Sequence, residues 1–343
     1  MTTVRAAGGP IATPQLPPAS ALGSRSALSR RSGRSAGVAI GLLSAMCFGT
    51  SGTFGTALIG AGWSPAGAVF ARVLVAALAL TVPAVLALRG RWRALRRSLW
   101  QVTVYGLVGV AACQVCYFNA IARMPVGISI MLEYLGIVLI VLWLWVRHGQ
   151  TPRPLTIGGG VAALGGLALM LNLTGAGGVS LIGVLFALTA AVSMAVYFFQ
   201  SAATSGAGSD AGPAAADSPG DLPAVVLTWG GMIVGAAAIA IGGAVRVTPM
   251  RFAASDVALF GGRTSWIVPV LGLGVVAAAI AYVTGIGAAR RLGPKFGSFV
   301  AMAEIGFAVL FAWILLHQTP TATQFVGGAL ILAGVIAVRL DEP

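Results

Sequence analysis

Charged side chains are scarce in this chain of 343 residues. They make up 8% of the sequence, whereas apolar residues make up 58%. A soluble domain carries about 25% charged residues. The scarcity excludes a large soluble domain and indicates an integral membrane protein.

Side chains that bind metals or do redox chemistry are also few, because the chain has only 2 histidines and 3 cysteines. Cys47, Cys113 and Cys116 fall inside apolar runs, where a CxxC pair lacks the polar access that a reactive thiolate needs. We interpret them as small packing residues. His148 and His317 lie at the ends of apolar runs. The sequence therefore predicts no metal site, no cofactor and no enzyme activity.

Ten apolar runs, each near the roughly 20 residues that cross a bilayer, predict an all-α integral membrane protein with ten transmembrane helices. Their limits are 36–59, 66–88, 101–122, 127–146, 155–171, 179–200, 223–245, 266–289, 297–316 and 323–340. Residues 1–35 are rich in Ala, Ser, Pro and Arg, and we expect a disordered cytoplasmic tail. Residues 201–222 form an acidic, low-complexity segment that we expect to be a flexible loop.

The formal net charge of +13 arises from arginines between the apolar runs. If the N-terminus is inside, most of these arginines lie on the inner side, and only Arg123, Arg246, Arg251 and Arg263 lie outside. The positive-inside rule then places both termini in the cytoplasm. The acidic loop at 201–222 runs against the rule, but the whole-chain bias favours this orientation. We expect a multi-pass protein of the plasma (inner) membrane, with the lipid bilayer and not nucleic acid as the partner of its basic residues.

The two halves of the chain repeat a pattern. A Met-x-Glu sequence ends at Glu133 in the first half and at Glu304 in the second, and two glycines seven residues apart occur from Gly158 and again from Gly327. Each half holds five apolar runs, so the second half starts from the opposite face of the membrane. The pattern predicts two inverted five-helix repeats, at 36–172 and 179–340, as in alternating-access carriers.

Three ionisable residues lie deep inside apolar runs: Arg72, Glu133 and Glu304. Insertion scales assign such charges a cost of about 2.5–3.5 kcal/mol, so they mark candidate functional sites. Arg72 and Glu133 each lie six residues from the outer end of a run, roughly 9 Å deep, which makes them candidates for an ion pair. Glu304 falls in the inner half and is a candidate for proton or substrate binding. The other candidates are polar residues predicted at these levels: Gln114, Tyr117 and Asn119 in the outer half, and Tyr197 and Tyr282 near Glu304.

The segment QTPTATQFVGGALILAGVIAV, at 318–338, resembles the end of an EamA-type transporter domain of the drug/metabolite transporter superfamily. Leu135-Gly136 after Glu133 resembles the Glu-x-x-Gly-Pro of amino-acid exporters in that family. The resemblance covers about residues 38–339.

The sequence departs from the family pattern at two places. Ile305-Gly306 stands where the family often has Pro after the second glutamate, and Gln150 and Gln318 stand where it often has Glu. No role of acidic groups at those positions is carried over to this chain.

The resemblance implies a secondary active transporter, an exporter of a small metabolite such as an amino acid, working by alternating access as a monomer or homodimer. Proton coupling through Glu304 is one hypothesis. A multidrug exporter is the nearest alternative. A membrane-embedded enzyme or a lipid-handling protein is a further alternative, and the enzyme is disfavoured because the sequence shows no paired catalytic groups.

Overall fold

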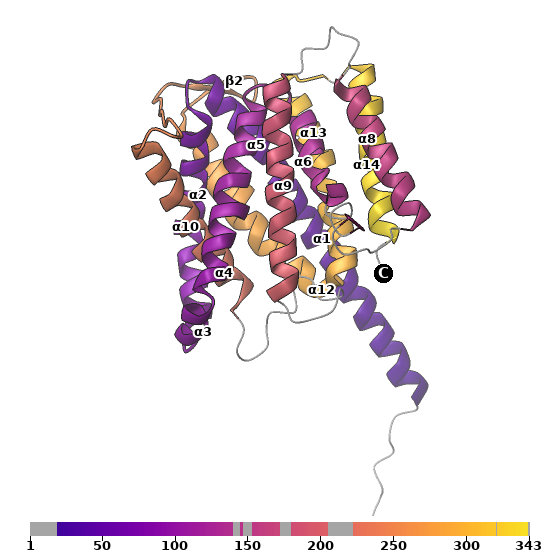
Figure 1. Cartoon of the computed structure of the whole chain (residues 1–343). Coiled ribbons are helices and arrows are strands. Elements are labelled where there is room, and N and C mark those ends of the chain that lie inside the picture. The colour runs from indigo at the N-terminus through magenta and orange to yellow at the C-terminus, as the bar shows by residue number, and fades with distance from the viewer. Residues whose placement is uncertain are drawn as a thin grey trace, which may run out of the picture.

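The structure is a computed structural model that describes residues 19–139, 145–146, 153–171, 180–204, 222–319 and 321–341. These residues form a bundle of long helices with one small hairpin at an end of the bundle (Figure 1). The elements in chain order are α1 (Ala19–Gly60), α2 (Pro65–Leu88), α3 (Trp92–Arg97), α4 (Leu99–Val104), η1 (Tyr105–Ala112), α5 (Cys113–Ile121), α6 (Val126–Tyr134), α8 (Pro154–Leu171), α9 (Leu181–Thr204), α10 (Ala224–Ala244), β1 (Val257–Leu259), β2 (Gly262–Thr264), α11 (Ile267–Leu271), η3 (Gly272–Ile280), α12 (Ala281–Ala301), α13 (Ala303–Leu316) and α14 (Ala322–Asp341).

The described helices confirm the prediction of a helical, multi-pass membrane protein. Five of them are long and apolar enough to cross a bilayer: Ser35–Gly60, Pro65–Leu88, Leu99–Ile121, Ala224–Ala244 and Ile267–Ala288. Shorter apolar helices lie at Val126–Leu139, Pro154–Leu169, Leu181–Ala195, Ala303–Leu316 and Ala322–Val338, within or close to the other predicted runs.

Helix α1 begins at Ala19, so residues 19–35 of the segment expected to be a disordered tail lie within it. Residues 19–34 are rich in serine and contain two glycines, which are poor helix formers. They contain no proline, so the membrane helix can continue back through them once it has nucleated. Pro17 and Pro18 precede the first residue of the helix. Residues 1–18 lie outside the described part of the chain. So do residues 205–221 of the predicted loop, whose first four residues end α9.

Two of the predicted membrane helices contain a π-helical stretch. The run at 101–122 is built from α4, η1 and α5, and the run at 266–289 from α11, η3 and the start of α12. A π-helical stretch changes which backbone groups are paired and is frequent at functional sites. Apolar periodicity carries no signal for it, so the sequence predicted plain helices here.

Helices α8 and α14 lie side by side and approach through glycine (Figure 1). A methyl group on Gly159 would come within 2.6 Å of the carbonyl oxygen of Gly334, and one on Gly166 within 2.5 Å of that of Gly327. In the second half the contacting glycines are the pair noted in the sequence, Gly327 and Gly334. In the first half they are Gly159 and Gly166, each one residue after the noted Gly158 and Gly165, which meet open space. Such close backbone approach is how helices associate in lipid.

The hairpin of β1 and β2 was not predicted from the sequence. Its two-residue turn has φ values of 56° at Phe260 and 74° at Gly261, as a type I′ turn requires. Phenylalanine is rare at such a position, which hides the usual Asn-Gly signal. Val257 and Leu259 are buried, and the indole of Trp63 donates to the carbonyl oxygen of Ala253 over 2.7 Å. The hairpin segment is thus fixed to the turn between α1 and α2.

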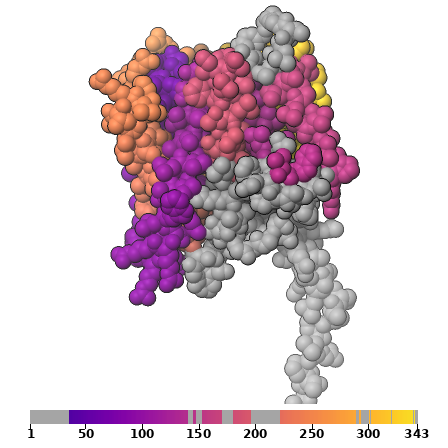
Figure 2. Space-filling view, viewed as in Figure 1, coloured from indigo at the N-terminus to yellow at the C-terminus, as the bar shows by residue number. Residues whose placement is uncertain are grey.

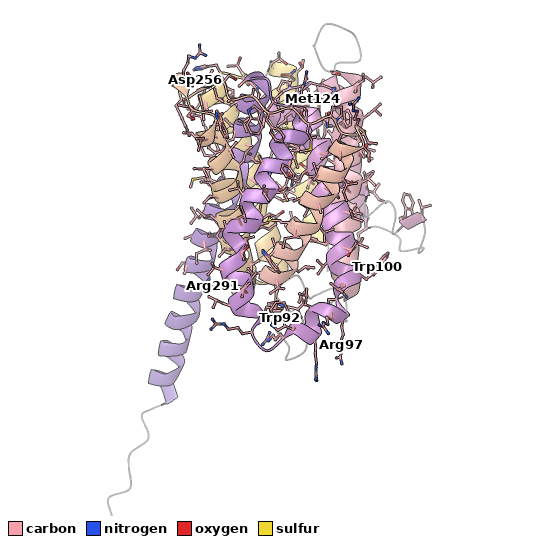
Figure 3. All side chains as sticks on the ribbon, turned by 90° about the vertical axis from the view of Figure 1, so that its left-hand side faces the viewer. Trp92, Arg97, Trp100, Met124, Asp256 and Arg291 are labelled. Carbon is pink, nitrogen blue, oxygen red and sulfur yellow. The ribbon has the colours of Figure 1, made fainter. Side chains whose placement is uncertain are left out.

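Charged residues mark both ends of the bundle. Figure 3 shows Asp256 at the hairpin end and Arg97 and Arg291 at the opposite end. Helix α3, with sequence WRALRR, carries exposed arginines and has no fully buried residue. In the space-filling view, α3 and α4 form the lower-left corner of the described surface (Figure 2).

Candidate functional site

Arg72 on α2 is buried within the bundle, with 4% of its surface exposed. Its Nη1 donates to Oγ of Ser51 over 2.5 Å and to Oε1 of Gln114 over 2.8 Å. Its Nη2 donates to the carbonyl oxygen of Ala277 over 3.1 Å. These acceptors come from α1, α5 and η3, so one guanidinium group joins four segments that are far apart in the sequence.

The local sequence explains how this buried cation is accommodated. Ala277 lies inside the π-helical stretch η3, where a backbone carbonyl can serve a side chain. The ring centre of Phe118 lies 5.9 Å from Cζ of Arg72, which allows a cation–π contact. Gly52 and Gly55 of α1 let α5 approach closely, since added methyl groups would touch Tyr117 and Phe118. The glycine-rich stretch 49–56 is therefore a close-packing surface beside Arg72.

The expected ion pair between Arg72 and Glu133 is not present among the residues that the structure describes. Helix α5 supplies a partner to each instead: Gln114 accepts from Arg72, and Sγ of Cys113 lies 3.2 Å from Oε1 of Glu133 as its hydrogen-bond donor. The sequence predicted that the two charges lie at the same depth in the membrane. Depth alone could not show that residues of α5 are the hydrogen-bond partners of both.

Glu133 and Glu304 belong to one polar site. Tyr134, the neighbour of Glu133 on α6, donates its hydroxyl to Oε2 of Glu304 on α13 over 2.9 Å. Helix α5 connects Arg72 to this site, because Gln114 accepts from Arg72 and its neighbour Cys113 donates to Glu133. The sequence predicted an outer and an inner cluster. They meet because each glutamate lies only a few residues from the middle of its run, and a tyrosine side chain spans the remaining gap.

Helix breaks lie beside both glutamates. Helix α6 ends at Tyr134, and the backbone N–H of Leu135 bonds to the carbonyl oxygen of Leu132 over 3.2 Å. In α13 the N–H of Ile305 bonds to the carbonyl oxygen of Met302 over 3.1 Å. Both bonds link residues three apart, tighter than an α-helical turn. The two Met-x-Glu sequences thus fall at the same kind of local irregularity.

The remaining predicted residues divide into two groups. Tyr117 is buried and packs against Phe118, whose ring faces Arg72, so it joins the site. Asn119 does not, because its amide donates to the carbonyl oxygen of Val115 and accepts from Arg123 at the end of α5.

Tyr282 packs edge-on against Phe48, with ring centres 4.9 Å apart. The side chain of Tyr197 lies outside the described part of the structure.

Sequence reasoning missed three members of the site: Ser51, Cys113 and Tyr134. Ser51 and Cys113 are small and lie in apolar runs, where they read as packing residues. Tyr134 follows Glu133 directly, and this adjacency was a usable signal, since a tyrosine in an apolar run needs a partner for its hydroxyl group.

Apolar helices that gather a buried arginine and two carboxyl groups inside a bundle define a polytopic membrane protein with a polar site at membrane depth. Residues 35–172 match the model of the EamA-like transporter family. Over these residues, the match confirms the resemblance to EamA-type transporters of the drug/metabolite transporter superfamily noted in the sequence.

Fifteen chains of solved structures are similar to this protein. One is a crystal structure with a TM-score of 0.57 and 21% sequence identity, and the alignment covers 90% of this chain and 99% of the other. At that identity the likeness concerns the fold. A search of curated proteins gave no match.

Proposed function

We propose that this protein is a secondary active transporter that exports a small metabolite, such as an amino acid, by alternating access. Its ten transmembrane helices form two inverted five-helix repeats, at 36–172 and 179–340. The repeats explain why π-helical stretches occur in the third helix of each half, as η1 and η3. They also explain why the glutamates beside helix breaks occur in the fourth helix of each half.

The packing of the helices supports an inverted repeat. Helix α10 packs against η1, and its counterpart α2 packs against η3. In the same way α9 packs against α6, and α1 packs against α13. Each of these contacts joins a helix of one half to a helix of the other, and the matching contact joins their counterparts. A pseudo-twofold axis between the halves requires this pattern, and a substrate site near that axis is typical of such carriers.

One observation carries the choice of substrate: Arg72 is buried and its three hydrogen bonds all go to uncharged groups. A buried charge that no carboxylate contacts directly is costly, and a substrate carboxylate would supply that contact. Glu133 and Glu304 nearby suit an ammonium group. A zwitterion such as an amino acid therefore matches the site, with Tyr117 and Gln114 as further contacts.

Proton coupling at Glu304 completes the proposal. Burial disfavours a carboxylate, and alternating access would expose this group to each side in turn. Both termini are cytoplasmic in this proposal, because the arginine-rich α3 lies at the end of the bundle away from the hairpin. The membrane is the plasma membrane.

Uptake into proteoliposomes tests the proposal. The purified protein is reconstituted and supplied with a panel of radiolabelled amino acids, other zwitterions, monocarboxylates and lipophilic cations, with and without a pH gradient. We expect saturable transport of at least one zwitterion, with accumulation only when the gradient is present. Transport of lipophilic cations alone would contradict the proposed substrate class and favour a multidrug exporter.

A further inference from the structure

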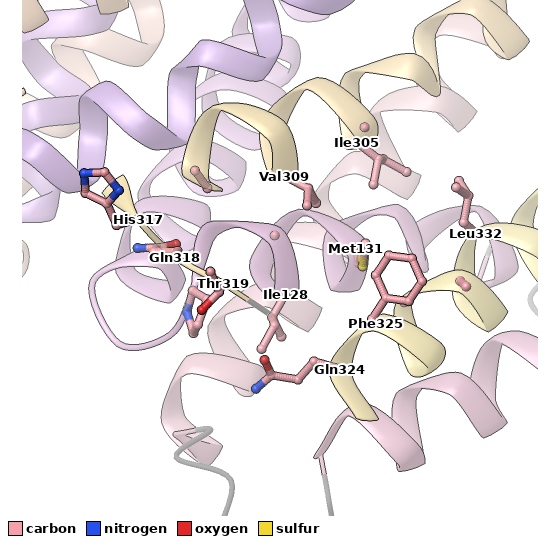
Figure 4. Close-up of a pocket in the computed structure, with 16 residues that line it drawn as sticks. Ile128, Met131, Ile305, Val309, His317, Gln318, Thr319, Gln324, Phe325 and Leu332 are labelled. Atoms are coloured by element: carbon pink, nitrogen blue, oxygen red, sulfur yellow. The ribbon is translucent and has the colours of Figure 1, made fainter. Parts of the chain in front are cut away.

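A groove of about 530 Å³ runs along the outside of the bundle between α6, α13 and α14. Its volume lies within the roughly 300–1,000 Å³ of ligand pockets. Figure 4 shows its two parts: His317, Gln318, Thr319 and Gln324 gather at one end, and apolar side chains line the rest. The side chains of Arg72, Glu133 and Glu304 do not line the groove, although Met131 and Ile305 on its wall are close to the two glutamates in the chain.

The depth of the groove matches one leaflet of a bilayer. On α14 it extends from Gln324 to Leu332, and on α13 from His317 to Ile305. At 1.5 Å per residue these stretches span roughly 12 and 18 Å. Half of the hydrocarbon core is about 15 Å thick. The polar end lies at the helix ends near the hairpin, so the groove runs from the membrane surface towards its middle.

The chemistry of the polar end suits a lipid headgroup. Oε1 of Gln318 accepts the backbone N–H of Val126, and Oε1 of Gln324 accepts that of Thr321. Because the side-chain oxygens of both glutamines already accept these bonds, their NH₂ groups are the donors at the polar end of the groove. The ester and phosphate oxygens of a glycerophospholipid are acceptors. None of the lining residues carries a fixed charge, so the match is to the acceptor-rich glycerol and phosphate region.

The apolar part suits an acyl chain. Ile128 and Ile305 form a buried floor, and Phe325 on α14 is 68% exposed beside them. Gly306 leaves open space, because an added methyl group there would meet no atom within 4 Å. The solvent at this depth is lipid, so a hydrocarbon chain is the group that fills this space.

We propose that this groove binds one glycerophospholipid of the leaflet on the hairpin side, with its head at Gln318 and Gln324 and one acyl chain between α13 and α14. The bound lipid wedges between the helix that carries Glu304 and the α8–α14 pair. It is held more tightly than the surrounding lipid because three helices contact it. The inference rests on the membrane fold and is independent of the transported substrate.

Native mass spectrometry tests this site. Protein delipidated in mild detergent is titrated with palmitoyl-oleoyl phosphatidylethanolamine, and the population with one bound lipid is measured. Gly306→Phe fills the groove from α13, and Ala329→Phe fills it from α14. We expect both variants to bind the first lipid about tenfold more weakly than the wild type.

Gly165→Phe is the matched control, since Gly165 is exposed on α8 with open space around it and does not line the groove. It should bind lipid as the wild type does. Circular dichroism checks that each variant is folded. The two variants that fill the groove change different helices, so if one of them fails to fold, the other still tests the proposal. Equal lipid binding by all four proteins would mean loosely associated lipid only and would overturn the proposal, as would an equal loss in Gly165→Phe.

Discussion

The hydroxyl group of Tyr134 on α6 donates a hydrogen bond of 2.9 Å to a carboxylate oxygen of Glu304 on α13. Glu133 precedes Tyr134 in the chain, so one bond brings the neighbourhoods of both intramembrane glutamates together. In the proposed repeat, α6 and α13 are equivalent helices. The bond therefore crosses the boundary between the halves, where alternating access requires movement.

Tyr134→Phe should destabilise the described conformation, because it removes the hydroxyl and leaves a carboxyl group without this donor. A hydrogen bond to a charged group contributes about 1.5–3 kcal/mol, and one to a neutral group about 0.5–1.5 kcal/mol. Thermal unfolding in detergent measures the loss, and a double-mutant cycle with Glu304→Gln measures the coupling. Strict additivity in the cycle would show that the bond contributes nothing.

Arg72 should be coupled in energy to Gln114 more strongly than to Glu133. Gln114 accepts a direct bond of 2.8 Å from the guanidinium group, whereas Glu133 receives its bond from Cys113. We expect a coupling of about 1 kcal/mol or more between Arg72→Met and Gln114→Leu. The coupling between Arg72→Met and Glu133→Gln should be smaller. If unfolding of the same variants gave a larger coupling of Arg72 to Glu133 than to Gln114, the ion pair predicted from the sequence would be supported instead.

Gly159→Val and Gly158→Val should differ sharply although the two residues are neighbours. A side chain at Gly159 would collide with the backbone of α14 at Gly334, while one at Gly158 would meet nothing within 4 Å. The first should lower the unfolding temperature and separate α8 from α14. The second should change it little. Similar melting curves for both variants would show that the glycine contact does not hold the two helices together.

The sequence predicted the membrane class and most helix positions because both follow from long apolar runs, which need no knowledge of partners. It singled out Arg72, Glu133 and Glu304 as candidates because charge at membrane depth is rare. It could not choose their partners, since Ser51 and Cys113 look like packing residues until helices are placed side by side.

The sequence also did not predict the local irregularities of the backbone. The π-helical stretch at η3 supplies Ala277 as an acceptor, and apolar periodicity does not reveal it. The hairpin turn at Phe260 uses a residue that is unusual for its conformation. The helical start at Ala19 follows from continuation of the membrane helix, which composition alone does not show.

The two ends of the bundle should be accessible from opposite sides of the membrane. Arg93 is exposed on α3, and Arg263 is exposed on β2. A membrane-impermeant maleimide applied to intact cells should label Arg263→Cys, and should label Arg93→Cys only after the cells are opened. The native cysteines are buried or half-buried, and the parent protein gives the background. Labelling of Arg93→Cys in intact cells would reverse the proposed orientation.

The central claim is that Glu304 couples proton movement to transport at the shared site. Glu304→Gln keeps the size of the side chain and removes its ability to release a proton. In proteoliposomes we expect this variant to exchange the transported zwitterion but not to accumulate it under a pH gradient, while the surface control Asp256→Asn accumulates it like the wild type. Full accumulation by Glu304→Gln under the same gradient would contradict the account.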